Sequence, residues 1–569
     1  MRHHAALIAT LVLLAAWPLR DALLTNTVPG AGPDVVSTLW GMWWFSQVGP
    51  LDAMGSQTDL VNFPYGATGS VLSPSSALLW TLLAPIFGAA RAASAAALLQ
   101  IAGLAAGCAW LVGRLTGSRW GGTAAGLVVL AARYLPFGAG EGSAVAVAAL
   151  PIPLGLLALH TGGWTGGLLA ALCMAGIAVE NPYLAPVLPG VAVLMALNAL
   201  RQRAPVAPLL CAVVLGSLGI VLVAGMFSSS ASPDYPREVA GQTVALLGRG
   251  FSIVDLPWAR ASPSELVWPG VVRWTLSAQE ATAATGGRYL GLAGLLLTGV
   301  AAVIRPRQSL PWLGFIAVGV ALSLGSITGG LAGPFLFLNA LMDAVARPLT
   351  QPTRFLALAV IGAAVCSGIA VTALVERWGR RVGVAALGIV LLDGLLLGGL
   401  SLRLPTTALP TGSCLAELED GGLLMWPWDA ELGELSDTQL YQIIHGHPSP
   451  QTGIASWALS AEGRVLTPLR GSGWSTDPTG RRLNLTKLIN LGYRWGVVAE
   501  AADPEGAAWL ASSLGSPLTA CDGLVIYDLV AAAPSQRKPR SGAGQGGGQG
   551  GGRPPGSPPS RPASVPESR

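Results

Sequence analysis

The sequence predicts an α-helical polytopic membrane protein of about eleven transmembrane helices, with its amino terminus inside and an external α/β module at its carboxyl end. Three observations predict this class. Only 11% of the 569 residues are charged and 52% are hydrophobic, whereas soluble domains carry about 25% charged residues. Apolar stretches recur up to residue 401, and the gaps between them alternate in charge. The net charge of +4 is too small to indicate a nucleic-acid partner.

Apolar stretches of about the length that a bilayer requires define the expected spans. The first follows a basic start, as in a signal peptide, but no convincing small-residue cleavage site follows it, so we interpret it as an uncleaved helix. A further segment, 74–89, is short and bounded by prolines, and we expect it to be re-entrant or interfacial. The eleven expected spans are 5–24, 91–113, 120–133, 143–160, 164–179, 184–200, 207–227, 288–304, 311–326, 355–375 and 382–401.

The positions of the charged residues test this topology. Cytoplasmic loops of membrane proteins are enriched in Lys and Arg. Four of the five gaps assigned to the inside are basic, with Arg114 and Arg119, Arg201 and Arg203, Arg305 and Arg307, and Arg377, Arg380 and Arg381. The gaps assigned to the outside hold acids: Asp34, Asp52, Asp59, Glu141, Glu180, Asp234 and Glu238. We therefore expect an integral membrane protein whose first loop (25–73), long loop (228–287) and chain after residue 403 lie outside.

Three domains follow: a transmembrane domain (1–403), an external α/β module (404–532) and a tail (533–569). The tail is rich in Gly, Pro and Arg and lacks the apolar residues needed for a core, so we expect it to be disordered. In the module, alternation and composition predict strands at 423–428, 493–499 and 523–529 and helices at 437–444 and 506–514.

The cysteines divide between these domains. Cys414 and Cys521 lie near the two ends of the module, where a disulfide would suit an oxidising compartment, although the sequence leaves free thiols open. The other four lie in expected spans, as small apolar residues: Cys108, Cys173, Cys211 and Cys366.

A lone carboxylate begins an aromatic segment of the first external loop, "PDVVSTLWGMWWFSQ". Asp34 precedes a predicted short helix whose Trp40, Trp43 and Trp44 share one face, as expected at a membrane interface. One interpretation is an N-cap, in which the carboxylate accepts a backbone N–H. The other is a functional acid that takes a proton from an acceptor hydroxyl or holds a divalent cation. The residues alone leave both open.

Two more acids are expected on the same side, each at the external end of a span. Glu141 could merely complement a helix dipole, whereas Glu180 follows its helix, so that explanation fails for it. Ionisable side chains within transmembrane segments tend to face an interior cavity. We therefore predict an acidic cavity in which Glu141 and Glu180 contact substrate, with Asp34 and Glu141 as candidate ligands of Mg or Mn.

Two arginines supply a basic counterpart at the outer end of the tenth span. Arg347 and Arg354 flank Pro348 and Pro352. The planar guanidinium donates two parallel hydrogen bonds and therefore suits phosphate. The alternative is that Arg354 only extends to the membrane interface.

Enzyme motifs of high specificity, such as a Walker loop or a Rossmann glycine pattern, do not occur in the sequence. His445 and His447 in "IIHGHPSP" could bind a metal, but we favour a solvated loop. Asp393 is the exception to the nearly charge-free span interiors.

Several segments resemble the GT-C superfamily of membrane glycosyltransferases, and bacterial members of it most of all. They are "PGAGPDVVSTLWGMWWFSQ", "NFPYGATGSVLSPSSALLWTLLAPIFG" and "GCAWLVGRLTGSRWGGTAAGLVVLAARYLPFG", followed by the later pieces "RPLTQPTRF", "YQIIHGHPSPQTGI" and "LGYRWGVVAEA". The resemblance covers most of the chain through short, degenerate motifs. It implies transfer of a sugar from a polyprenyl-phosphate donor to an envelope glycan, lipid or protein on the outer face of the membrane, with inversion at the anomeric carbon. It also implies that Asp34 is the general base or a metal-site residue, that Glu141 is the acid after the third span, and that Arg354 faces the donor phosphate.

Two rival functions stay open at this point. A transporter or flippase of lipid-linked saccharides predicts functional polar groups near the bilayer midplane and inverted repeats. A catalytically inactive scaffold is the other rival, because the sequence has one acid where some members of the superfamily have an acidic pair.

Overall fold

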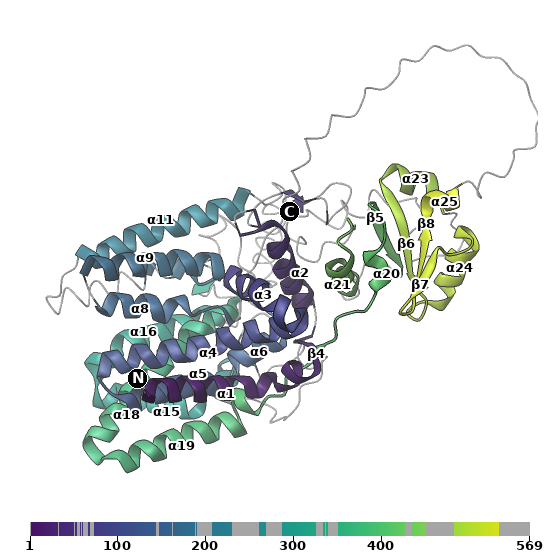
Figure 1. Ribbon diagram of the computed structural model, residues 1–569. Helices are drawn as coiled ribbons and strands as arrows, with labels where there is room; N and C mark the ends of the chain where they lie inside the picture. The colour runs from purple at the N-terminus through teal and green to yellow at the C-terminus, as the bar shows by residue number, and fades with distance from the viewer. Residues whose placement is uncertain are drawn as a thin grey trace, which may run out of the picture.

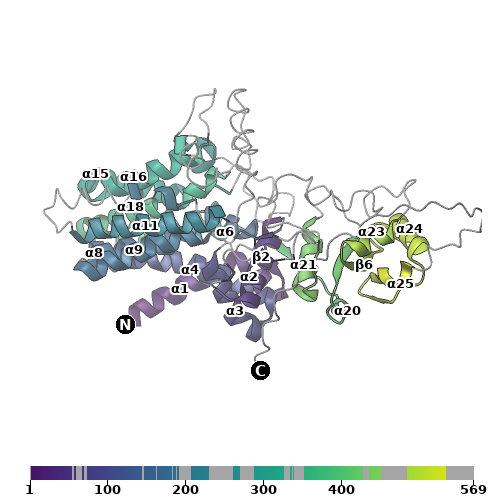
Figure 2. The ribbon, with the colours of Figure 1, turned by 90° about the horizontal axis from the view of Figure 1, so that it is seen from above.

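A computed structural model describes the chain over residues 2–31, 33–50, 52–53, 57–58, 60, 67–68, 73–143, 147–161, 163–181, 183–187, 189–190, 207–229, 261–268, 287–325, 334–335, 337–338, 351–426, 435–449 and 483–533. A helical bundle fills one side of the molecule and a small sheet the other, with α2, α3 and α21 between them (Figures 1 and 2). Arg347 and most of the expected span 184–200 lie outside the described residues.

Five helical segments within the described residues are long and apolar enough to cross a membrane: Ala5–Thr25, Ala89–Thr116, Arg119–Gly140, Gly163–Glu180 and Pro352–Trp378. Each overlaps an expected span. Shorter apolar helices occupy other expected positions, and α8 (Pro151–Thr161) begins eight residues after the predicted start of its span, 143. Its prolines at positions 151 and 153 suit a first helical turn, which accounts for the late start. The structure thus supports a membrane protein, and the count of eleven stays a prediction.

The bundle is built around α18 (Leu356–Trp378), which is buried from Leu356 to Ala373. It packs against α5 (Arg119–Ala131), α15 (Leu292–Ile304), α16 (Pro306–Ser323) and α19 (Arg380–Leu396). On the other side of α5 follow α4 (Ala89–Thr116), α1 (Arg2–Thr25) and α8, and then α9 (Gly163–Glu180) and α11 (Ala207–Ser229).

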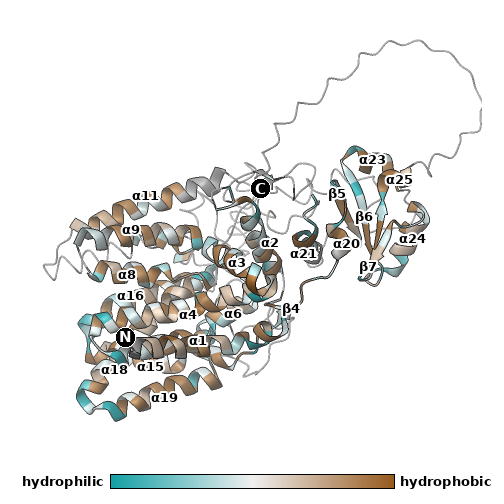
Figure 3. Ribbon diagram, viewed as in Figure 1, coloured by the Kyte–Doolittle hydropathy of each residue, from teal (hydrophilic) through white to brown (hydrophobic). Residues whose placement is uncertain are grey.

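Hydrophobic residues predominate along these helices (Figure 3), and many of their large apolar side chains are exposed. Examples are Trp17 on α1, Leu172 on α9, Leu218 on α11 and Ile389 on α19, all more than half exposed. Exposed apolar surface of this extent is unfavourable in water and favourable against lipid chains.

The predicted basic gaps at 305–307 and 377–381 lie at the same end of the bundle as the turn between α4 and α5, which is also basic. Arg305 pairs with Glu376, and a Cβ on Gly121 would contact Thr372, so the α4–α5 turn lies beside the end of α18. The first residues of α18 lie about 34 Å away, at 1.5 Å per residue. This grouping agrees with the predicted alternation of charge and leaves the sidedness of the membrane a prediction.

The loop that follows α1 and its partners cover the other end of the bundle. Its first strand, β1 (Val28–Pro29), pairs with β4 (Thr406–Thr407), so the loop joins the chain that leaves the bundle. The helix α2 (Pro33–Val48) packs against α3 (Pro74–Phe87) and α21 (Leu435–His445). Further short elements here are β2 (Gln57–Thr58), β3 (Ala67–Thr68), α6 (Tyr134–Gly140), η1 (Ala185–Val187), α13 (Pro263–Val267), η3 (Pro352–Phe355) and η4 (Gly399–Ser401).

The carboxyl-terminal sheet contains the three expected strands, β5 (Gly422–Trp426), β6 (Tyr493–Ala499) and β8 (Leu524–Asp528). A fourth strand, β7 (Thr519–Cys521), was not predicted because it is short and exposed. The order is β5-β6-β8-β7, with β5 and β6 parallel and the other pairs antiparallel. The accompanying helices are α20 (Ser413–Ala416), α23 (Leu485–Asn490), α24 (Pro504–Leu514) and α25 (Leu529–Ala532). A disulfide joins Cys414 in α20 to Cys521 in β7.

Candidate functional site

Asp34 and Arg354 meet at the end of the bundle opposite the basic turns. Asp34 is the second residue of α2, which begins at Pro33, so it lies inside the first turn and not at the N-cap. Its Oδ2 atom lies 3.4 Å from Nη2 of Arg354. The Asp34 side chain is 43% exposed and that of Arg354 only 7%. A carboxylate that solvent can reach is therefore held beside a buried guanidinium, which the capping interpretation does not explain.

Arg354 is fixed by more than this ion pair. It lies in η3, where its Nε donates to Oε1 of Gln351 at 2.6 Å. The carbonyl of Arg354 accepts a hydrogen bond from the hydroxyl of Tyr134 at 3.1 Å. A residue held in this way does not extend to the membrane interface, so the alternative interpretation of Arg354 is wrong.

Close backbone contacts at two glycines place Glu141 beside the start of α2, which carries Asp34. Gly142 has a φ of +77°, and a Cβ there would lie 2.2 Å from Cγ2 of Val35, the neighbour of Asp34. A Cβ on Gly30, whose φ is +106°, would lie 2.6 Å from the backbone N of Gly142. The hydroxyl of Thr38 then ties α2 to the carbonyl of Gly142 at 2.8 Å. Only residues without a Cβ allow this contact, which sets Glu141 beside the start of α2.

The charges of Asp34 and Arg354 both influence the pKa of Glu141. Burial raises the pKa of Glu141 to about 7, against an attraction to Arg354 that lowers it, and the charge of Asp34 raises it further. Arg288, which is paired with Glu265 at 3.0 Å, also lowers the Glu141 pKa. Near neutral pH, Glu141 is therefore able to exchange a proton.

Glu180 has quite different surroundings. Its Oε2 accepts from the hydroxyls of Ser73 at 2.7 Å and Ser75 at 2.8 Å, and its Oε1 accepts from the backbone N of Ser75 at 2.7 Å. Gln100 donates to Ser75 and Ser76 behind them. Because Ser73, the N-cap of α3, makes no side-chain cap bond, Glu180 caps α3 from another helix. Both of its oxygens are engaged, and we leave it out of the proposed site.

Asp393 lies within the eleventh expected span, as predicted. Asp393 accepts from the hydroxyl of Tyr289 at 2.5 Å and from the backbone N of Ala293 at 3.0 Å, so it ties α19 to the first turn of α15. The expectation of a solvated loop at His445 and His447 is wrong. Both are buried and stacked, with ring centroids 5.4 Å apart.

No protein-family model matches the chain, and no curated protein matches it. Twenty-two chains of solved structures are similar to it. One is the arabinofuranosyltransferase AftD from Mycobacteria, with a TM-score of 0.50 and 15% identity over 93% of this chain and 41% of that chain. Another is the oligosaccharyltransferase AglB from Archaeoglobus fulgidus, solved with an inhibitory peptide and a dolichol-phosphate (TM-score 0.45, 12% identity, 89% and 71% of the chains). A third is ArnT from Cupriavidus metallidurans (TM-score 0.39, 13% identity, 93% and 98%).

Of these three, AftD carries the fold comparison at its TM-score of 0.50, and it is a GT-C glycosyltransferase. The chain has the GT-C fold. Likeness at such low identity shows the fold alone, so the chemistry depends on the site itself.

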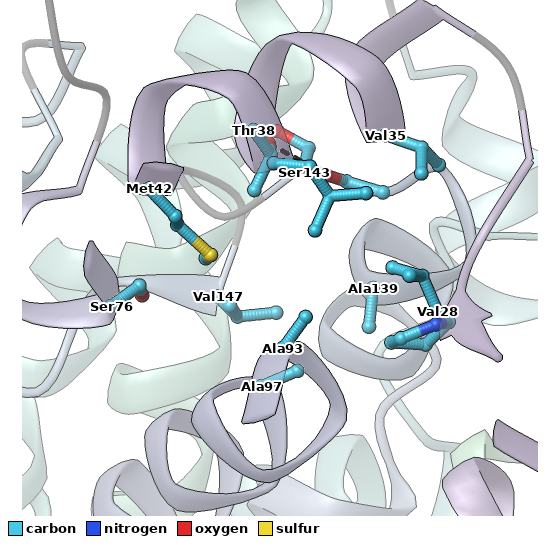
Figure 4. A pocket seen from close by; sticks show the side chains of 13 residues that line it. Val28, Val35, Thr38, Met42, Ser76, Ala93, Ala97, Ala139, Ser143 and Val147 are labelled. Atoms are coloured by element: carbon cyan, nitrogen blue, oxygen red, sulfur yellow. Dashed lines mark hydrogen bonds between the residues drawn. The ribbon is translucent and has the colours of Figure 1, made fainter. Parts of the chain in front are cut away.

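A small apolar cavity lies beneath α2 in this GT-C fold (Figure 4). Its volume is about 30 Å³, and its wall includes Val35, Thr38 and Met42 of α2 and Ala93 and Ala97 of α4. Such a space is too small for a lipid chain.

The predicted metal site is not formed by the described residues alone. They contain no group of three or more His, Cys, Asp or Glu side chains placed to hold an ion. At Asp34 a guanidinium lies 3.4 Å from the carboxylate and competes with a cation for it. We therefore derive no step through a metal, and the expectation of Mg or Mn stays a prediction.

Three residues of the site escaped the sequence analysis: Tyr134, Gln351 and Arg288. The first two flank arginine in the quoted segments "RYLPFG" and "QPTRF". Gln351 lies three residues before the predicted Arg354, which was the available signal for it, whereas Arg133, the neighbour of Tyr134, was not predicted. Hydrogen bonds between distant segments leave no periodic pattern in a sequence.

Proposed function

We propose that the protein is a membrane glycosyltransferase that moves a sugar from a polyprenyl-phosphate donor to an acceptor hydroxyl of the cell envelope, on the external face of the bacterial cytoplasmic membrane. The observation that carries this proposal is the pairing of a half-exposed carboxylate, Asp34, with a buried arginine, Arg354, at one end of an apolar bundle with the GT-C fold. An apolar bundle suits a donor whose carrier is a lipid.

In the proposed reaction Asp34 removes the proton from the acceptor hydroxyl. The acceptor oxygen forms a bond to the anomeric carbon while the bond from that carbon to the phosphate oxygen breaks, which inverts the configuration. The electron pair leaves with polyprenyl phosphate, and Arg354 offsets the growing negative charge through directed hydrogen bonds. No oxidant, reductant or nucleotide is needed.

Glu141 is proposed as a substrate-binding group. Its pKa near 7 keeps part of the population protonated, and a protonated carboxyl donates a hydrogen bond to a sugar or phosphate oxygen. Arg347 is proposed as a second phosphate contact from the sequence alone.

The test is sugar transfer by the full chain in membranes, with a panel of labelled polyprenyl-phosphate sugars and an acceptor extract from the native envelope. Asp34→Asn keeps the shape of the side chain and removes its basicity, so we expect transfer to fall at least a hundredfold. Asp21→Asn is the matched control, because Asp21 also pairs with an arginine, Arg403, but on α1. Transfer by Asp34→Asn at the wild-type rate would contradict the assignment of the base.

A further inference from the structure

One buried glutamine connects the carboxyl-terminal part of the chain to the helix that carries Asp34. Gln442 of α21 is fully buried. Its Oε1 accepts from the indole Nε1 of Trp40, in α2, at 2.7 Å. Its Nε2 donates to the carbonyl of Leu60, in the first external loop, and to that of His447 at 2.9 Å. The side-chain amide thus bonds two distant segments, through Trp40 and Leu60, and the chain five residues after it, through His447.

The surrounding contacts make a continuous seam, formed by residues 440–449 and called here the docking segment. Ser449 donates its backbone N–H to the carbonyl of Leu60 at 2.9 Å. Leu440 packs into the tryptophan cluster of α2, where Trp40 stacks on Trp44 at 5.7 Å. At its far end the docking segment joins the sheet, since Leu423 of β5 donates to the carbonyl of Pro448 at 2.8 Å.

The opposite side of α2 contacts Gly142 closely at Val35 and also borders a cavity. Val35, Thr38 and Met42 face the cavity of about 30 Å³ (Figure 4), where packing atoms are missing. The hydrogen bond from Thr38 to Gly142 is the polar tie found there among the described residues of the cavity wall. Asp34 lies six residues before Trp40, about 9 Å along the helix axis. A rotation of α2 about its axis would therefore move the carboxylate away from Arg354.

We propose that Gln442 is a positioning residue of the candidate site: it locks the docking segment onto α2 and so holds Asp34 beside Arg354. This inference rests on the proposed function for its catalytic consequence. Its structural consequence, a more mobile α2, does not depend on any activity. The proposal gives the docking segment a role in the reaction although it is distant from Asp34 in sequence. Gln442 and Trp40, which it bonds, are 402 residues apart.

Hydrogen–deuterium exchange of the full chain in lipid nanodiscs tests the structural part. Gln442→Leu removes all three hydrogen bonds and strands their buried partners, so we expect the α2 amides of residues 38–48 to exchange about tenfold faster. Trp40→Phe removes one donor and should raise the rate less. The double variant should match Gln442→Leu, because the bond is already lost.

Trp426→Phe is the matched control. Trp426 is an equally buried tryptophan that donates to Oδ2 of Asp503 at 3.1 Å, within the sheet module and away from α2. It should leave α2 exchange unchanged. An unchanged rate in Gln442→Leu, or an equal rise in Trp426→Phe, would overturn the proposal.

The catalytic part is measured with the same variants by initial rates of sugar transfer per folded protein. We expect Gln442→Leu to lower kcat about tenfold and to leave the donor KM within twofold, since the base moves while Arg354 stays. A loss confined to KM would overturn the positioning role. If the wild type transfers no sugar, the proposed function fails, and the exchange experiment still decides whether Gln442 holds α2.

Discussion

Asp34 and Glu180 look alike in the sequence, as acids on the same side of the predicted membrane, yet the structure treats them in opposite ways. Asp34 is 43% exposed and has a charged partner at 3.4 Å. Glu180 is buried, and three hydrogen bonds from two serines engage both of its oxygens. The difference teaches that a carboxylate available for chemistry is one whose hydrogen-bonding capacity the fold has left partly unused.

The largest effect should come from the partner of Asp34. Arg354→Gln removes the buried charge that would offset the leaving phosphate, and we expect sugar transfer to fall by about 10²–10³, the range found when a preorganised donor is lost. Arg305→Gln is the control, since it breaks an ion pair with Glu376 at the other end of the bundle. Equal losses of the initial transfer rate in both variants would contradict a specific role of Arg354 in sugar transfer.

The close approach between the first loop and Glu141 gives the next effect. Gly142→Ala places a Cβ 2.2 Å from Val35 at a positive φ, so we expect a loss of about 1–3 kcal/mol in stability and a clear loss of transfer. Gly163→Ala has a similar φ of +71° with nothing within 4 Å, and so measures backbone strain alone. An equal decrease in the thermal unfolding temperature of both variants would show that the clash with Val35 does not affect stability.

Glu180→Gln should show the reverse profile to Asp34→Asn. The amide loses one acceptor toward Ser73 and Ser75, which should lower stability by about 1–3 kcal/mol, while kcat/KM for transfer stays within a few-fold of the wild type. Thermal unfolding and transfer rates measured on the same samples separate the two. A hundredfold loss of transfer with normal stability would return Glu180 to the catalytic site and end the contrast.

The last expected effect is a dependence of stability on pH. The pKa of Glu141 is about 7 in the fold against an ordinary 4.5, so between these values the folded state binds more protons than the unfolded state. Stability attributable to this group is therefore greatest below pH 4.5 and falls as the pH rises toward 7. The difference between wild type and Glu141→Gln, followed by thermal unfolding from pH 4.5 to 8, should show this slope. A difference that does not vary with pH would contradict it.

Composition and periodicity were enough to predict the class of the protein, the five long apolar helices, three strands of the module, and Asp34, Glu141 and Arg354 as candidates. These are local properties, because a helix or strand needs only its own residues to show its period and an acid near a span end is visible by itself. The full count of spans and their orientation stay predictions.

Only the tertiary structure decided which candidates meet. The contacts of Asp34 with Arg354, of Gly142 with Val35 and of Gln442 with Trp40 join segments that lie about one hundred to four hundred residues apart. The burial of His445 and His447 and the capping of α3 by Glu180 depend in the same way on distant segments. Such contacts follow from how helices pack and have no period along the chain, which is why a single sequence does not contain their signal.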